Sequence, residues 1–145
     1  MFTHLLPNSD SLLRVTFSDF AKKHFLKSFQ KRYKGKQWEL TEESIKQDLA
    51  RLRIGSNTIQ ETQQIDELYH EGEYWIAKYD FRIAGTKQST KTSGNRCIIF
   101  IDNGKNRCEI LLIYSKTDLP ANKKETQYIN DILEKEFPEY YHIAR

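Results

Sequence analysis

The chain has 145 residues, a formal net charge of +3 and 30% charged residues, which fits one polar domain spanning residues 1–145. Hydrophobic residues make up 38% of it, and eight Phe, eight Tyr and two Trp supply surface for a folded core, which argues against disorder. The sequence has no run of about 20 apolar residues, as a membrane helix needs, and no signal-peptide pattern at its start. We therefore expect a cytoplasmic protein.

Positive charge is concentrated in two parts of the chain. Residues 20–38 contain no acidic residue, and the only acidic residue in 78–96 is Asp80, whereas acidic residues outnumber basic ones in 118–139. A basic stretch of this kind fits a surface that binds a polyanion or an acidic protein segment. For the first stretch, a solvated helix face without a ligand explains the pattern equally well.

The N-terminal part predicts one short strand and two helices. Residues 12–16 form an apolar run with a β-branched end, which is typical of a strand. In residues 17–33 the apolar positions recur every three or four residues, so we expect a helix that a hydroxyl side chain caps at its start. A second helix is predicted to begin at a Thr41 cap and to end at Gly55.

The middle of the chain changes to the two-residue period of strands. We expect strands at residues 64–69, 74–83, 96–102 and 108–115. Turn residues between Asp102 and Asn106 predict that the last two strands form a hairpin. A final helix is expected over residues 122–137, where Pro138 ends it. This order of elements predicts an α+β fold, with a helix hairpin and a C-terminal helix on one face of a small antiparallel sheet.

Several common catalytic and metal-binding patterns are absent from the sequence. No two histidines have the spacing of a metal site, and neither Cys97 nor Cys108 has a histidine nearby. We expect both cysteines to be small buried hydrophobes. The sequence also lacks a G-x-x-x-x-G-K-[ST] phosphate loop and a G-x-S-x-G nucleophile motif. We therefore predict no metal and no cofactor.

Cationic and hydroxyl side chains are expected to meet at one end of the sheet. Lys78 and Arg82 share one strand face, Arg96 begins the next strand, and Tyr114 and Lys116 end the strand after it. Lys78 and Arg96 would be neighbours of like charge, which is unfavourable unless an anion lies between them. Solvation of a sheet edge explains any one of these side chains, but the whole set favours an anion site.

Three segments carry a family resemblance when they are taken together. They are KYDFRI at 78–83, KTSGNRCIIF at 91–100 and ILLIYSK at 110–116. The combination resembles the RelE/ParE superfamily of toxins from bacterial toxin–antitoxin systems, and especially its HigB-like branch. The resemblance implies a helix hairpin packed on a small twisted antiparallel sheet, with a C-terminal helix.

The resemblance also implies a function and partners. It predicts a type II toxin that cleaves mRNA on the ribosome without a metal, and a cognate antitoxin that often contains a helix-turn-helix domain. Arg96 matches the arginine that contacts the phosphate. The predicted catalytic residues are Lys78, Arg82, Lys91, Arg96, Tyr114 and Lys116. The resemblance and the basic stretches together predict contacts to RNA or the ribosome from Lys22, Lys23, Lys27, Lys31, Lys87 and Ser93.

The sequence departs from the family pattern at two points. Asn95 replaces the second glycine of the family's SGG turn, and Asn tolerates the left-handed backbone that such a turn requires. The arginine that ribonuclease members carry beyond the last strand is missing, since Thr117 and Asp118 follow Lys116. Two other functions therefore stay open, namely a toxin that binds a protein such as DNA gyrase and an RNA-binding relative without catalytic activity.

Overall fold

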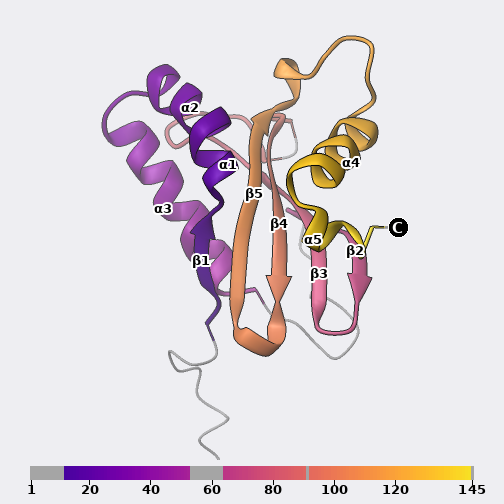
Figure 1. The fold of residues 1–145 in the computed structure, drawn as a ribbon. Coiled ribbons are helices and arrows are strands. Elements are labelled where there is room, and N and C mark those ends of the chain that lie inside the picture. Colours follow the sequence, from indigo (N-terminus) through magenta and orange to yellow (C-terminus); the bar gives the residue numbers. More distant parts are fainter. Residues whose placement is uncertain (1–11, 53–63, 91, 145) are drawn as a thin grey trace, which may run out of the picture.

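The computed structural model describes residues 12–52, 64–90 and 92–144, which build one five-stranded sheet (Figure 1). The strand order is β1-β5-β4-β3-β2; β1 runs parallel to β5, and the other neighbours are antiparallel. The strands are β1 (Arg14–Phe17), β2 (Ile65–Glu71), β3 (Tyr74–Phe81), β4 (Asn95–Asp102) and β5 (Arg107–Ser115). The helices are α1 (Asp19–Ala21), η3 (Lys22–Leu26), α2 (Lys27–Arg32), α3 (Lys36–Ala50), η4 (Asn103–Lys105), η5 (Lys116–Asp118), α4 (Glu125–Glu136) and α5 (Pro138–Tyr141). The predicted α+β class is confirmed.

The two faces of the sheet carry separate hydrophobic cores. The core that joins the sheet to α2 and α3 includes Phe29, Leu49, Trp75 and Ile110. The core that joins the sheet to α4 includes Ile98, Leu112, Ile129 and Leu133. The expectation that all helices cover one face is therefore wrong, because the C-terminal helices lie on the face opposite α3.

The apolar runs of β4 and β5 explain why both faces need a cover. Every residue in 97–101 and in 110–114 is buried. A strand without polar alternation has two apolar faces, so a layer of helices must shield each of them from water. The strands themselves lie within two residues of their predicted bounds.

The first predicted helix forms over α1, η3 and α2 without a break. Ser18 caps it, because the Ser18 hydroxyl accepts a hydrogen bond of 3.0 Å from the Ala21 N–H. The middle part, η3, is a π-helical turn, which inserts an extra residue and shifts the side chains that follow it. His24 in this turn is exposed, with its ring 4.6 Å from the ring of Phe20.

The second helix begins earlier than predicted, and Thr41 is not its cap. Helix α3 starts at Lys36, after Gly35 has turned the chain with a φ of 67°. Thr41 is buried within α3, where its hydroxyl donates to the Gln37 carbonyl and accepts from the Ala84 N–H, both at 2.8 Å. Thr41 thus joins α3 to the loop after β3. The predicted helix end at Gly55 lies outside the described residues.

Replacing Thr41 with valine is expected to lower the free energy of unfolding by about 1–3 kcal/mol, because the Ala84 N–H loses its acceptor while the shape of the side chain is kept. Denaturant titration measures the change. Thr126→Val, at an exposed position of α4, is the control and should change the value by less than about 0.5 kcal/mol. Equal effects of the two substitutions would contradict this role of Thr41.

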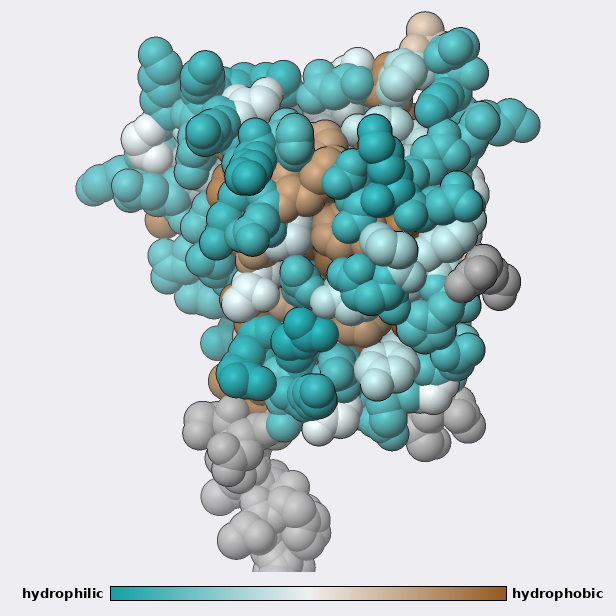
Figure 2. All heavy atoms as spheres, viewed as in Figure 1, coloured by the Kyte–Doolittle hydropathy of each residue, from teal (hydrophilic) through white to brown (hydrophobic). Residues whose placement is uncertain are grey.

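The surface in Figure 2 is largely hydrophilic, with hydrophobic residues visible between the N-terminal and the C-terminal helices. Phe20 and Phe25 are only partly buried and pack against the α4 core. Both cysteines are buried, as predicted. None of the described helices is long and apolar enough to cross a membrane.

Candidate functional site

The register of three neighbouring strands brings predicted site residues together. Arg96 of β4 lies opposite Tyr114 of β5 and opposite Asp80 of β3. Lys78 lies two residues before Asp80 and therefore on the same face of the sheet. This is the face that α4 covers. The structure thus places Lys78, Arg96 and Tyr114 on one face of the sheet, with Arg96 and Tyr114 at the end where the sequence predicted that these side chains meet.

One carboxylate, from Glu125 at the first position of α4, lies among these three side chains. Nη1 of Arg96 donates a hydrogen bond to Oε1 of Glu125 within an ion pair. The Tyr114 hydroxyl donates to the second oxygen, Oε2, at 2.6 Å. The charge of Lys78 also acts on Glu125, since it helps to lower the pKa of the carboxyl. Arg96 and the Tyr114 hydroxyl therefore bind Glu125 as an anion, and the charge of Lys78 adds to its stabilisation.

The protonation states at Glu125 follow from these contacts. Burial alone would raise the pKa of Glu125, but the hydrogen bonds from Arg96 and Tyr114 outweigh it, and the pKa lies below its ordinary value. The pKa of Tyr114 is raised, first by burial and then by the hydrogen bond to Glu125. At neutral pH the pair therefore consists of a charged carboxylate and a protonated phenol.

Asp80 is a second carboxylate beside Arg96. Its side chain is only 5% exposed, and Oδ1 lies 3.2 Å from Nε of Arg96. Neither atom has a hydrogen-bond partner among the described residues, so the contact is an attraction between charges without good hydrogen-bond geometry. Burial raises the pKa of Asp80, and the positive charges of Arg96 and Lys78 only partly oppose that shift.

Carboxylates of the same chain lie beside every cation of this cluster and outnumber the cations. Lys78 also lies 3.9 Å from Asp66 of β2, so two cations face the three carboxylates of Asp66, Asp80 and Glu125. The expectation that Lys78 and Arg96 need an external anion is therefore wrong for this structure. Like charges are tolerated there because the chain supplies its own anions.

The other predicted catalytic residues lie outside this cluster or are not described. Lys116 is exposed, and its N–H donates to the Gly94 carbonyl at 2.7 Å, which places it beside the turn before β4. Arg82 is exposed just beyond the end of β3. Both therefore flank the end of the sheet at which Arg96 and Tyr114 lie. Lys91 lies outside the described residues.

Of the predicted RNA contacts, the five lysines are exposed, whereas Ser93 is partly buried. The side chains of Lys22, Lys23, Lys27, Lys31 and Lys87 are exposed. The Ser93 hydroxyl is instead engaged within its loop, since it lies 2.6 Å from the Phe81 carbonyl, to which it donates, and accepts from the Asn95 N–H at 3.2 Å. Ser93 thus shapes the turn that leads into β4.

A similar cluster at the other end of the same sheet face provides a natural comparison. The Tyr140 hydroxyl donates to Glu109 at 2.7 Å, and Arg107 lies 3.6 Å from the same carboxylate. The side chain of Arg107 is 36% exposed, whereas that of Arg96 is 12% exposed. The sequence predicted no function for this second Arg–Glu–Tyr set, so its members serve as matched controls below.

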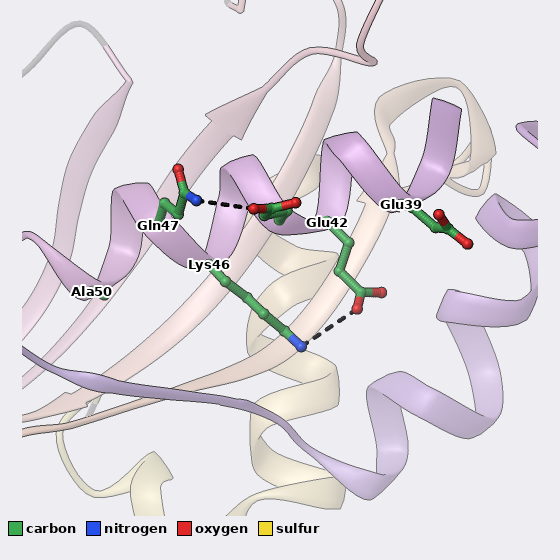
Figure 3. Close-up of a pocket in the computed structure, with 6 residues that line it drawn as sticks. Glu39, Glu42, Lys46, Gln47 and Ala50 are labelled. Atoms are coloured by element: carbon green, nitrogen blue, oxygen red, sulfur yellow. Dashed lines mark hydrogen bonds and ion pairs between the residues drawn. The ribbon is translucent and has the colours of Figure 1, made fainter. Parts of the chain in front are cut away.

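The structure also contains a surface hollow of about 400 Å³ along α3, away from these cations (Figure 3). Three glutamates rim it, and two of them pair on the helix: Glu42 with Lys46 at 3.4 Å, and Glu43 with Gln47 at 3.1 Å. Its acidic rim disfavours phosphate. Among the described residues, no group of three His, Cys, Asp or Glu side chains could hold a metal ion. The candidate site is therefore the cationic cluster.

The lowered pKa of Glu125 makes stability depend on pH in a defined direction. Folding favours the charged form of Glu125. Its contribution to the free energy of unfolding is therefore complete above the ordinary pKa of about 4.5, and it is lost as the pH falls through the lower pKa of the folded state. We expect the wild type to unfold with a larger free energy than Glu125→Gln at neutral pH, and the difference to shrink below about pH 4.5. Denaturant titrations across this range measure it, and a difference independent of pH would contradict the assignment.

The two carboxylates that pair with Arg96 were not identified from the sequence. Asp80 stands out in the sequence as the one acid of a basic stretch, and this was a usable signal. Glu125 gave a weaker one, because it lies far along the chain in an acidic segment. Tyr114 ends a buried apolar run, and a buried phenol usually finds a hydrogen-bond partner, but the sequence does not say which residue supplies it.

Comparisons of this chain with protein-family models, with curated proteins and with solved structures find no match.

Proposed function

We propose that the chain is a toxin of the RelE/ParE type that binds mRNA on the ribosome and cleaves it. The observation that carries the proposal is that Arg96 and Tyr114 bind one carboxylate, Glu125, which the charge of Lys78 also stabilises. Donors that bind a carboxylate suit a phosphate as well, because both are oxyanions bound by charge-assisted hydrogen bonds. The sequence resemblance assigned Lys78, Arg96 and Tyr114 on separate grounds.

The proposed reaction requires from the protein only proton transfer and the stabilisation of charge. The 2′-oxygen of RNA bonds to the adjacent phosphorus, and the bond from phosphorus to the 5′-oxygen breaks. The 2′-hydroxyl gives up a proton and the leaving 5′-oxygen gains one, so a cyclic phosphate and a 5′-hydroxyl result. Arg96 and Lys78 stabilise the negative charge that develops on the phosphoryl oxygens, and Tyr114 remains a hydrogen-bond donor because its pKa is raised.

Cations around the cluster suit the RNA on either side of the reacting phosphate. Lys116 and Arg82 are exposed at the same end of the sheet. The lysines of the first helix are exposed, and of these Lys22, Lys23, Lys27 and Lys31 have no carboxylate within 4 Å among the described residues. Such a surface supports ribosome and mRNA as partners through their phosphates. A cognate antitoxin is the third partner of the proposed toxin.

A second candidate function is RNA binding without cleavage. The observation that favours it is the pairing of Arg96 with Glu125 and Asp80, which neutralises the one arginine assigned to the phosphate. In that function the exposed lysines hold the RNA and Arg96 is a structural residue. Binding that weakens steeply with salt, without cleavage, distinguishes this candidate.

Purified ribosomes programmed with an mRNA test the proposal. The wild type should cut the mRNA only when ribosomes are present, and primer extension should locate the new 5′ ends. Lys78→Ala and Arg96→Lys should reduce the rate by about a hundredfold or more, whereas Arg107→Lys, the matched arginine at the other end of the sheet, should not. Intact mRNA with the wild type, or equal rates for Arg96→Lys and Arg107→Lys, would overturn the proposal.

A further inference from the structure

Glu125 occupies the donors of the candidate site. Its two carboxylate oxygens are bound separately, one by Arg96 and the other by the Tyr114 hydroxyl. A phosphate group at the same place would need the same donors. One set of donors cannot bind both anions at once, so an incoming phosphate competes with Glu125.

The first turn of α4, which carries Glu125, can open locally while the rest of the protein stays folded. The buried anchors of α4 are Ile129 and Leu133, one turn and two turns further along the helix. The segment that leads into α4, residues 116–124, is exposed except for the half-buried Leu119. Unwinding the first turn of α4 therefore moves Glu125 and the half-buried Tyr128, whose ring lies 5.6 Å from the ring of Tyr114, but leaves both buried anchors in place. Local opening of this kind needs less free energy than global unfolding.

We propose that Glu125 is an internal competitor for the anion site of Lys78, Arg96 and Tyr114, and that an RNA phosphate binds there by displacing the first turn of α4. In the absence of RNA the carboxylate holds the site closed. The apparent affinity for RNA is then reduced by the fraction of molecules in which the site is closed. The inference rests on the proposed function for the identity of the ligand, but RNA binding tests it without cleavage.

Glu125→Gln removes the competing charge and keeps the size of the side chain. We expect this variant to bind a short single-stranded RNA with 2′-O-methyl sugars, which prevent cleavage, about tenfold more tightly than the wild type. Glu109→Gln is the matched control, because Glu109 accepts from a tyrosine and pairs with an arginine at the other end of the same face. It removes the same net charge and should change the affinity by less than about twofold. Adding Lys78→Ala to Glu125→Gln should reverse the gain.

A second measurement uses the wild type and does not depend on any variant folding. The Tyr128 N–H donates to the Lys124 carbonyl at 3.0 Å in the first turn of α4. Adding the same RNA should speed hydrogen exchange at Tyr128 and leave exchange at Leu133 unchanged. Unchanged exchange at Tyr128 in the RNA-bound protein would overturn the proposal, as would equal RNA affinities of Glu125→Gln and Glu109→Gln.

These outcomes separate the inference from the proposed function. Tighter RNA binding by Glu125→Gln without cleavage by either protein would support the internal competitor and reject the nuclease. Cleavage by the wild type with no effect of Glu125→Gln on RNA binding would support the nuclease and reject the competitor.

Discussion

Replacing Arg96 with alanine is expected to lower the free energy of unfolding by about 3 kcal/mol. The substitution removes the ion pair with Glu125 and leaves Asp80, whose side chain is only 5% exposed and fixed in β3, without its arginine. Removing one partner of a buried ion pair is strongly destabilising because the remaining charge stays out of water. Chemical denaturation at neutral pH measures the change.

The matched substitution is Arg107→Ala. Arg107 is more exposed and lies 3.6 Å from its carboxylate, so we expect a loss of only about 1 kcal/mol. Adding Asp80→Asn to Arg96→Ala should restore part of the stability, because it removes the unpaired buried charge. Equal losses for Arg96→Ala and Arg107→Ala, or no recovery with Asp80→Asn, would show that the ion pairs of Arg96 do not stabilise the fold.

Truncation of Leu133 is expected to have an effect of similar size. Leu133 is fully buried in the core between α4 and the sheet, so Leu133→Ala loses apolar contacts and leaves a cavity. Substitutions of this type cost about 2–5 kcal/mol. Thermal and chemical unfolding measure the loss. Leu40→Ala is the control, since Leu40 is 55% exposed, and it should cost less than about 0.5 kcal/mol.

Leu133→Ala also tests whether α4 depends on its anchor rather than on Glu125. If the buried side chains hold α4, amide hydrogen exchange in its central turns should accelerate in Leu133→Ala and stay near the wild-type rate in Glu125→Gln. Acceleration throughout α4 in Glu125→Gln would instead mean that the ion pair holds the whole helix on the sheet.

Local patterns in the sequence were sufficient to predict most of the secondary structure. The alternation around Trp75 and the turn residues from Asp102 to Asn106 determine local geometry, so β3 and the hairpin of β4 and β5 lie close to their predicted bounds. Asn106 adopts the left-handed conformation, with a φ of 51°. The start of α3 was missed because Thr41 matches the residue type of a cap, although its hydroxyl serves a contact with Ala84, which is far along the chain.

The placement of elements depends on contacts that are distant in sequence, and here the prediction was weaker. Nothing in the residues of β1 specifies its parallel pairing with β5. The position of α4 on the second face was available in principle, because the fully apolar runs of β4 and β5 require cover on both sides. The helix pattern of residues 122–137 shows one apolar face but does not say which side of the sheet that face covers.

The candidate site was likewise predictable where it depends on local strand patterns, and not where it depends on contacts distant in sequence. Strand order predicted that Arg96 and Tyr114 lie at the same end of the sheet, and the register of β3, β4 and β5 places Lys78 on the same face as both. The pattern of cations could not show that Glu125 neutralises them, because the loop between β5 and α4 decides where that carboxylate lies. The inference of an external anion failed for this reason, and the chain's own anion now defines the site.

Mapping 5′ ends of transcripts in a bacterium that expresses the chain tests the central claim most directly. If the cationic cluster cuts translated mRNA, growth should stop and new 5′ ends should appear within coding regions, and both effects should be lost with Arg96→Lys but kept with Arg107→Lys. Growth arrest with intact transcripts would contradict the claim, and broken DNA in the same cells would point to a target such as gyrase.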